Sequence, residues 1–136
     1  MNTTNYENSK KLAEIGFLEK SKKGYFKREK DGDILLLDAD RLEHHIDGKV
    51  YTFKCLAFDL ETILNALPNA VDNYGTLTIR RSYDHWIDEY FQTIDYGGLD
   101  TYYHRKGHDE SLADTAARLL IKLVEQKIIN FNKSPS

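Results

Sequence analysis

The stretch from Asp109 to Asn130, DESLADTAARLLIKLVEQKIIN, decides the fold class of this chain. Its apolar residues recur at spacings of three and four, which places them along one side of an α-helix. Ser111 and Asp114 resemble a capping box at the start, and Asn130 suits a left-handed stop at the end. The stripe consists of Leu112, Ala113, Ala116, Ala117, Leu120, Leu123 and Val124. A helix of this length cannot bury such a stripe alone, so the rest of the chain must supply a surface.

Three further apolar residues, Leu119, Ile121 and Ile129, make this stripe wider than a single sheet requires. Two arrangements would cover the excess. Either the first helix of the chain packs beside the C-terminal helix, or a second subunit does. The sequence leaves both open.

Composition is that of one folded domain spanning residues 1–136, with flexible tails expected over 1–5 and 131–136. Of 136 residues, 40% are hydrophobic and 30% charged, and the net charge of −3 lacks the basic excess of nucleic-acid binders. No apolar run is long enough for a membrane span, and no signal-peptide layout opens the chain. A single cysteine, Cys55, excludes an internal disulfide and a paired-cysteine zinc site. We therefore expect a cytoplasmic protein.

The rest of the chain alternates helical and strand signals in the order α-βββ-α-βββ-α, which predicts an α+β fold with antiparallel sheets and helices on one face. One continuous sheet and two packed sheets both fit this order. Residues 39–46 either continue a strand or form a loop. The predicted helices are 6–15, a short helix capped by Asp59 and stopped by Pro68, and the C-terminal helix; the predicted strands are 24–29, 34–38, 49–57, 76–82, 86–94 and 99–105.

An aromatic concentration marks the second half of the chain, where six tyrosine and tryptophan residues fall between Tyr83 and Tyr103. A strand that begins at Trp86 would place Trp86, Asp88, Tyr90 and Gln92 on one face. Such a face is typical of a recognition surface, and equally of an ordinary antiparallel sheet. Arginines on neighbouring strands would suit a small anionic, nucleotide-like ligand. The candidate ligand-binding residues are Arg80, Arg81, Trp86, Tyr90, Tyr103 and Arg105.

No pattern indicates catalysis, and we expect no catalytic residue, metal or cofactor. Nucleophile and phosphate-loop motifs are absent from the sequence. Cys55 lies mid-strand on an apolar face, which favours a core position. His44 and His45 are adjacent, so a strand points them to opposite faces. A cluster of aspartates at 31, 33, 38 and 40 is interrupted by an apolar strand, and a hairpin turn explains it better than a calcium loop.

Three segments resemble small uncharacterised proteins of bacterial genomes and of phage or other mobile elements. The segments are AFDLETILNALP (57–68), YDHWIDEYFQT (83–93) and GHDESLADTAARLLIKLVEQKII (107–129). Those proteins combine a short leucine-rich helix, a tryptophan hairpin and a closing helix. The resemblance covers about residues 55–129 and implies a mobile-element origin. No activity, cofactor or catalytic residue travels with it.

The sequence is compatible with three functions, which we rank by the number of special residues that each requires, with the fewest first. The first is a non-enzymatic interaction module that binds a protein partner or itself. The second is a binder of a small anionic ligand through the arginine and aromatic residues named above. The third is a metal-dependent hydrolase that would use His104, His108 and Asp109.

Overall fold

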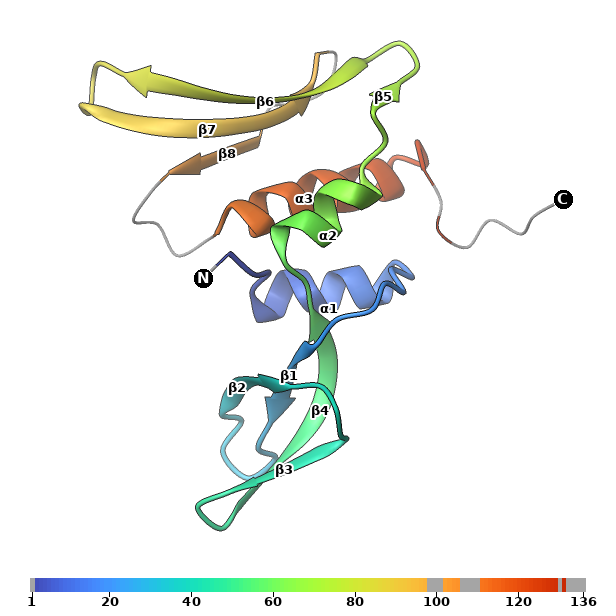
Figure 1. Ribbon diagram of the computed structural model, residues 1–136, viewed down its shortest axis with the longest axis vertical. Coiled ribbons are helices and arrows are strands. Elements are labelled where there is room, and N and C mark those ends of the chain that lie inside the picture. Colours follow the sequence, from blue (N-terminus) through green and yellow to red (C-terminus); the bar gives the residue numbers. More distant parts are fainter. Residues whose placement is uncertain (1, 98–101, 106–110, 130, 132–136) are drawn as a thin grey trace, which may run out of the picture.

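The computed structural model describes residues 2–97, 102–105, 111–129 and 131. Its helices and strands form three layers, in which the helices lie between two antiparallel sheets (Figure 1). The fold is therefore α+β, as predicted. In chain order the elements are α1 (Tyr6–Glu14), β1 (Lys23–Lys27), β2 (Ile34–Asp38), β3 (Glu43–Ile46), β4 (Lys49–Ala57), α2 (Leu60–Ala66), β5 (Ala70–Val71), β6 (Gly75–Asp84), β7 (Glu89–Tyr96), β8 (Tyr102–Arg105) and α3 (Leu112–Glu125).

The first sheet has the strand order β2-β1-β4-β3. Its β3–β4 hairpin turns at Asp47 and Gly48, whose φ angles of 50° and 76° suit a tight two-residue turn. β1 approaches β4 closely at Gly24, where a Cβ atom would lie 2.9 Å from the ring of Phe53. Phe26 is fully buried against the rings of Phe53 and His44. This sheet thus has a small aromatic core of its own.

The second sheet has the order β5-β6-β7-β8, and its β6–β7 hairpin is the longest in the protein's described part. At one end of this hairpin, Ile94 and Tyr96 are fully buried in the core that includes α3. The other end extends beyond the helices (Figure 1). The hairpin is therefore anchored at one end and exposed at the other.

The helix layer covers the wide apolar stripe of α3. Leu119 is fully buried and Ile121 is almost so, within a core that also contains Leu12 of α1 and Ile63 of α2. Ile129 packs half-buried against the same core. The first of the two predicted arrangements is confirmed, because neighbouring helices of the same chain cover the excess.

A buried carboxylate joins the helix starts. Asp114, which is 1% exposed, completes the predicted capping box of α3 by accepting the N–H of Ser111 at 3.0 Å. It also accepts the backbone N–H of Asn5 at 2.7 Å and the side-chain amide of Asn8 at 3.0 Å. Asn5 in turn caps α1 by accepting the N–H of Asn8. One side chain thus stabilises the N-terminal ends of two helices.

Residues 2–5 differ from the flexible tail that was predicted over 1–5. Thr4 is fully buried and donates its N–H to the carbonyl of Phe58 at 2.8 Å. Asn2 accepts the N–H of Ala113, and Thr3 accepts the hydroxyl of Ser111. The side chain of Asn2 and the backbone of Thr3 thus bond to the start of α3, which a one-dimensional pattern does not reveal. Of the predicted tail over 131–136, Phe131 lies within the described residues, where its ring packs on Phe17.

Two short strands were missed by the sequence analysis. β3 occupies part of the open range 39–46, and β5 lies where a loop was expected. β5 has two residues, so it carries no periodicity. β3 pairs with β4 across the recognised Asp47–Gly48 turn. Its Glu-His-His-Ile sequence lacks the apolar alternation that marks a strand.

We expect Asp114→Ala to lower the free energy of unfolding by about 3 kcal/mol or more, because at least three N–H donors lose a buried charged acceptor. Asp59→Ala is the matched control. It removes the exposed N-cap carboxylate of α2, which accepts the N–H of Thr62, and should cost about 1 kcal/mol. Urea unfolding followed by circular dichroism measures both. Equal costs for the two variants would show that Asp114 is an ordinary cap.

Stability should also fall in alkaline solution. Burial raises the pKa of Tyr96 to about 12; burial, with the negative charge of Asp114 second, raises that of Tyr25 to about 12. Their hydroxyls donate to the carbonyls of Pro68 and Thr4, respectively. Because an unfolded tyrosine has a pKa near 10, this contribution is complete below about pH 10 and is lost as pH rises through 12. The melting temperature should drop over that window, and less steeply in Tyr96→Phe. An unchanged slope in that variant would contradict the assignment.

Candidate functional site

The β6–β7 hairpin ends in a turn over residues 85–88 that presents a tryptophan to solvent. Trp86 is 97% exposed. Its backbone N–H donates to the carboxylate of Asp84 at 2.9 Å, which holds the start of the turn. Asp88 closes the turn with a φ of 55°, a left-handed conformation that aspartate tolerates. The backbone of the turn is therefore locally braced, while the indole itself stands in water.

Aromatic rings line the strands directly behind this turn. Tyr83 and Tyr90 are cross-strand partners with ring centroids 4.9 Å apart, and the ring of His85 lies 4.8 Å from that of Tyr83. The guanidinium of Arg81 lies over the Tyr90 ring at 4.4 Å. Contacts of this kind hold large side chains in fixed orientations at low entropic cost. We call the set Arg81, Tyr83, His85, Trp86, Ile87 and Tyr90 the tip cluster.

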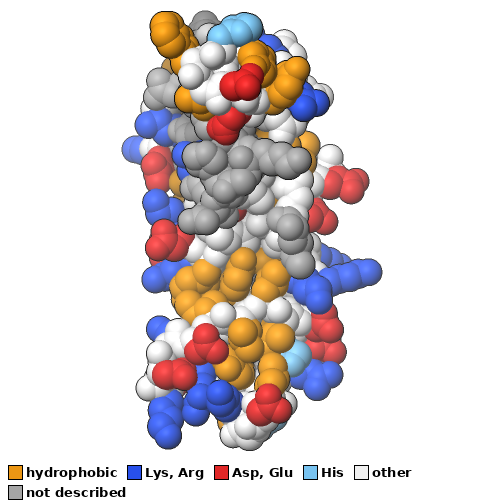
Figure 2. Space-filling model, turned by 90° about the vertical axis from the view of Figure 1, so that its left-hand side faces the viewer, with side chains coloured by type: hydrophobic (Ala, Val, Ile, Leu, Met, Phe, Trp, Pro, Cys, Tyr) orange, Lys and Arg blue, Asp and Glu red, His pale blue; other side chains and the backbone are white. Residues whose placement is uncertain are grey.

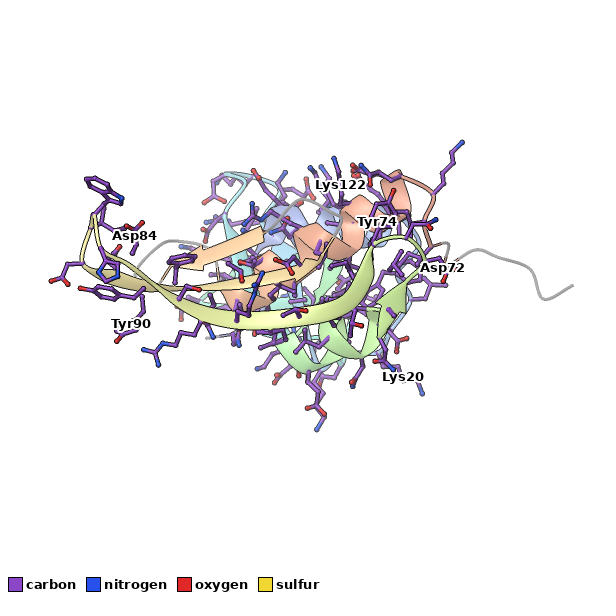
Figure 3. All side chains as sticks on the ribbon, turned by 90° about the horizontal axis from the view of Figure 1, so that it is seen from above. Lys20, Asp72, Tyr74, Asp84, Tyr90 and Lys122 are labelled. Carbon is purple, nitrogen blue, oxygen red and sulfur yellow. The ribbon has the colours of Figure 1, made fainter. Side chains whose placement is uncertain are left out.

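The tip cluster lies away from the protein core. Figure 3 shows Asp84 and Tyr90 at the far end of the hairpin, while Tyr74 and Asp72 lie at the opposite end of the second sheet. In Figure 2, hydrophobic side chains gather at the upper end of the molecule beside a histidine and acidic side chains. Ile87 is 50% exposed and Tyr90 55% exposed. With Trp86 they expose apolar side chains at a projecting end of the molecule, not in a cavity.

The acidic residues of this end flank the tryptophan. Asp84 precedes the turn, Asp88 lies within it, and Glu89 begins β7. Three carboxylates next to Trp86 disfavour the approach of a phosphate backbone or an anionic membrane surface. A cationic rim on a partner would suit them.

The six ligand-binding candidates from the sequence are only partly brought together. Arg81 and Tyr90 are in contact, and Trp86 lies at the end of the same hairpin. Arg80 leaves β6 on the opposite face, where its guanidinium lies 3.2 Å from the buried carboxylate of Asp95. On β8, Tyr103 pairs in register with Thr93 and Arg105 with Phe91. Ligand binding by these residues remains a prediction.

The predicted position of Trp86 on a strand was wrong. The predicted strands 76–82 and 86–94 leave the turn at 83–85, but β6 continues to Asp84 and β7 begins at Glu89. Because tryptophan favours strands, the strand was predicted to start at Trp86, three residues before its observed start. The aspartates at both ends, Asp84 and Asp88, are the signal that could have located the turn. His85 and Ile87 were missed as members of the tip cluster for the same reason.

A small groove between α1 and α3 gathers positive charge. It has a volume of about 210 Å³ and is lined by Asn8, Lys11, Arg118, Ile121, Lys122 and Glu125. None of the six predicted ligand-binding residues lines it. A second groove of about 320 Å³, between the β5 region and Ile128–Ile129, is mostly apolar. Both are at or below the small end of the range for sites that enclose a drug-sized ligand.

Within the described residues, the reactive side chains are not brought together into one site. Burial raises the pKa of the Cys55 thiol to about 11, so Cys55 is the core residue that was predicted, not a nucleophile. The ring of His44 bonds the carbonyl of Asp38 at 2.7 Å. No group of three metal-ligating side chains occurs in the described ranges. The His108–Asp109 pair of the hydrolase hypothesis lies outside the described residues, as does the side chain of His104.

The aspartates that were weighed as a calcium loop bond to separate partners. Asp33 accepts the hydroxyl of Tyr51 at 2.9 Å, and Asp31 accepts the N–H of Asp33 at 3.1 Å. Asp38 pairs with Lys23 and Asp40 with Arg41. These contacts match the hairpin interpretation.

Comparison with protein-family models, with curated proteins and with solved structures returns no match to this chain. None of the helices in the described part of the chain has the length and hydrophobicity that a membrane crossing requires. The function must therefore be inferred from the geometry of the molecule itself.

Trp86 is the single tryptophan of the chain, so its fluorescence reports on the tip cluster alone. With the indole 97% exposed, we expect a red-shifted emission and acrylamide quenching almost as efficient as that of free N-acetyltryptophanamide. Unfolding in urea should change both quantities little. A blue-shifted, poorly quenched emission in the native protein would contradict the exposed position of the side chain.

Proposed function

We propose that this protein is a non-enzymatic interaction module that binds a protein partner through the tip cluster of the β6–β7 hairpin. The observation that carries the proposal is the 97% exposure of Trp86 at the end of a braced hairpin. Tryptophan, tyrosine and arginine are the residues most enriched among those that dominate binding energy at protein interfaces. The tip cluster contains all three.

The energy available at this surface is large enough for binding. A tryptophan buries roughly 150–250 Å², which at about 25 cal/mol per Å² corresponds to about 4 to 6 kcal/mol before the costs of association. Ile87 and Tyr90 extend the apolar area, and the ring contacts behind them limit the side-chain entropy lost on binding. A projecting aromatic side chain on a braced turn fits a pocket on another protein.

Self-association receives less support than a different partner. The apolar stripe of α3, which had suggested a second subunit, is covered within the chain by α1 and α2. The tip cluster projects, and the described grooves are lined by charged residues or lie at the other end of the second sheet. We therefore place a distinct protein partner first and a homo-oligomer second.

Binding of a small anionic ligand ranks below both. The groove between α1 and α3 supports it through Lys11 and Lys122. Glu125 also lines that groove, which lies toward the C-terminal halves of both helices, where the helix dipole favours cations.

Trp86→Ala tests the proposal. Immobilised wild-type protein should retain at least one protein from a lysate of the source organism, and the variant should retain about thirtyfold less of it, as expected for a residue that dominates binding. Leu18→Ala is the matched control, because Leu18 is 87% exposed but follows α1, far from the hairpin in sequence. Quantitative mass spectrometry measures retention, and a blue shift of Trp86 emission on adding the purified partner locates the contact. Two results would rule the function out. The first is a protein that is monomeric in light scattering and retains no other protein. The second is retention that Trp86→Ala and Leu18→Ala reduce equally.

A further inference from the structure

One edge of β6 is open over most of its length. β7 pairs with β6 from Leu77 to Asp84 on one side. On the other side, β5 pairs with Gly75 and Thr76, and the N–H of Leu77 donates to the carbonyl of Asn69 at 2.9 Å. Within the described ranges no strand continues this pairing beyond Leu77. β5 and β7 thus leave a free edge on β6 next to the tip cluster.

The backbone groups that face this edge follow from the antiparallel pattern. The N–H and C=O of a strand residue point to the same side, and the side alternates from one residue to the next. Because the N–H of Leu77 points toward β5, those of Ile79, Arg81 and Tyr83 point toward the open edge. The groups of Thr78, Arg80 and Ser82 bond β7 instead. Three donors and three acceptors therefore form a row that an extended chain can pair with.

The side chains along the edge specify the chemistry of an added strand. Arg80 and Arg81 are neighbours at its centre and project on opposite faces of the sheet, one toward Asp95 and the other over Tyr90. The Arg80 side chain is 63% exposed, and a guanidinium stacked on a ring keeps its in-plane N–H groups available. An incoming antiparallel strand places one residue opposite each arginine. Two adjacent acidic residues in that strand would meet one arginine on each face.

A second copy of β6 fits this edge poorly. Antiparallel self-pairing about the centre of the edge would set Arg81 of one copy opposite Arg81 of the other, and like charges directly across a sheet are destabilising. Apolar or β-branched residues in a foreign strand would suit Ile79, which is 46% exposed, and Tyr83. The edge thus favours an acidic extended segment over another copy of this chain.

We propose that the open edge of β6, from Ile79 to Tyr83, binds an extended segment of the partner protein as an added antiparallel strand, with two adjacent acidic residues opposite Arg81 and Arg80. The inference rests on the proposed function, since the segment belongs to the same partner that the tip cluster contacts. Read from its N-terminus, the segment has the pattern apolar, any residue, acidic, acidic, apolar. The tip cluster then anchors a folded part of the partner, and the edge selects the sequence of the segment beside it.

The test uses the full-length protein and a synthetic peptide, Thr-Val-Thr-Glu-Glu-Val-Thr, with Thr-Val-Thr-Lys-Lys-Val-Thr as its matched control. In the free protein, the amides of Ile79, Arg81 and Tyr83 should exchange with solvent faster than those of Thr78, Arg80 and Ser82. Adding the acidic peptide should shift the first set in a nitrogen–proton correlation spectrum and slow its exchange at least about tenfold. The lysine peptide should do neither.

Two variants sharpen the result. Arg81→Glu should weaken binding of the acidic peptide about tenfold and strengthen that of the lysine peptide. Ile79→Pro removes an outward N–H but no bond to β7, so it should abolish peptide binding while the melting temperature stays near that of the wild type. If Ile79→Pro fails to fold, the charge reversal at Arg81 still tests whether the acidic peptide binds at this edge.

The possible outcomes separate this inference from the proposed function. No change at the three edge amides with millimolar acidic peptide, or equal binding of both peptides, overturns the inference. If a captured partner shifts the Trp86 indole but leaves the edge amides unchanged, the edge proposal fails while the interaction function stands. If the peptide binds the edge but no protein depends on Trp86, the tip proposal fails instead.

Discussion

A carboxylate buried between the starts of two helices is the constraint on which the rest of this structure depends. α1 and α3 run in the same direction, so their positive N-terminal ends lie side by side (Figure 1). Asp114 lies between them and accepts N–H groups from Asn5, Asn8 and Ser111. The same contact brings the beginning of the chain to its last helix. The helix layer, which supports both sheets, is thereby held in one arrangement.

Sequence patterns predicted those helices and strands that are specified by the residues within them. The apolar stripe of α3 and the alternation in β4 are strong periodic signals, and the bounds of β2 and β4 agree with those predicted. What failed depends on distant partners. The burial of Thr4 follows from contacts with Phe58 and Ser9, and the role of Asp114 toward Asn5 spans more than a hundred residues. No local pattern encodes such contacts.

The candidate site shows the same division between local and distant information. Arg81, Trp86 and Tyr90 were recognised because aromatic and cationic residues are concentrated there, but their grouping depends on where the hairpin turns. Because the turn lies at residues 85–88, Trp86 moves from a sheet face to a projecting end. Strand alternation then separates Arg80 from Arg81, so residues adjacent in sequence face opposite sides. The arginine pair both discourages self-pairing of the open edge and specifies which foreign strand can use it.

The hydrogen bond between Asn5 and Asp114 also limits how early in its synthesis the protein can complete its fold. A ribosome releases the chain from its N-terminus, so residues 2–5 leave the exit tunnel about 110 residues before the helix that they bond. The four-stranded sheet of β1 to β4 can pair while translation continues, because its contacts are local. Asn5 and Asn8, however, lack their final hydrogen-bond acceptor until α3 emerges. Completion of the native fold is thus tied to the synthesis of α3, and a chain truncated before Asp114 would leave the N–H of Asn5 and the side-chain amide of Asn8 without their carboxylate acceptor.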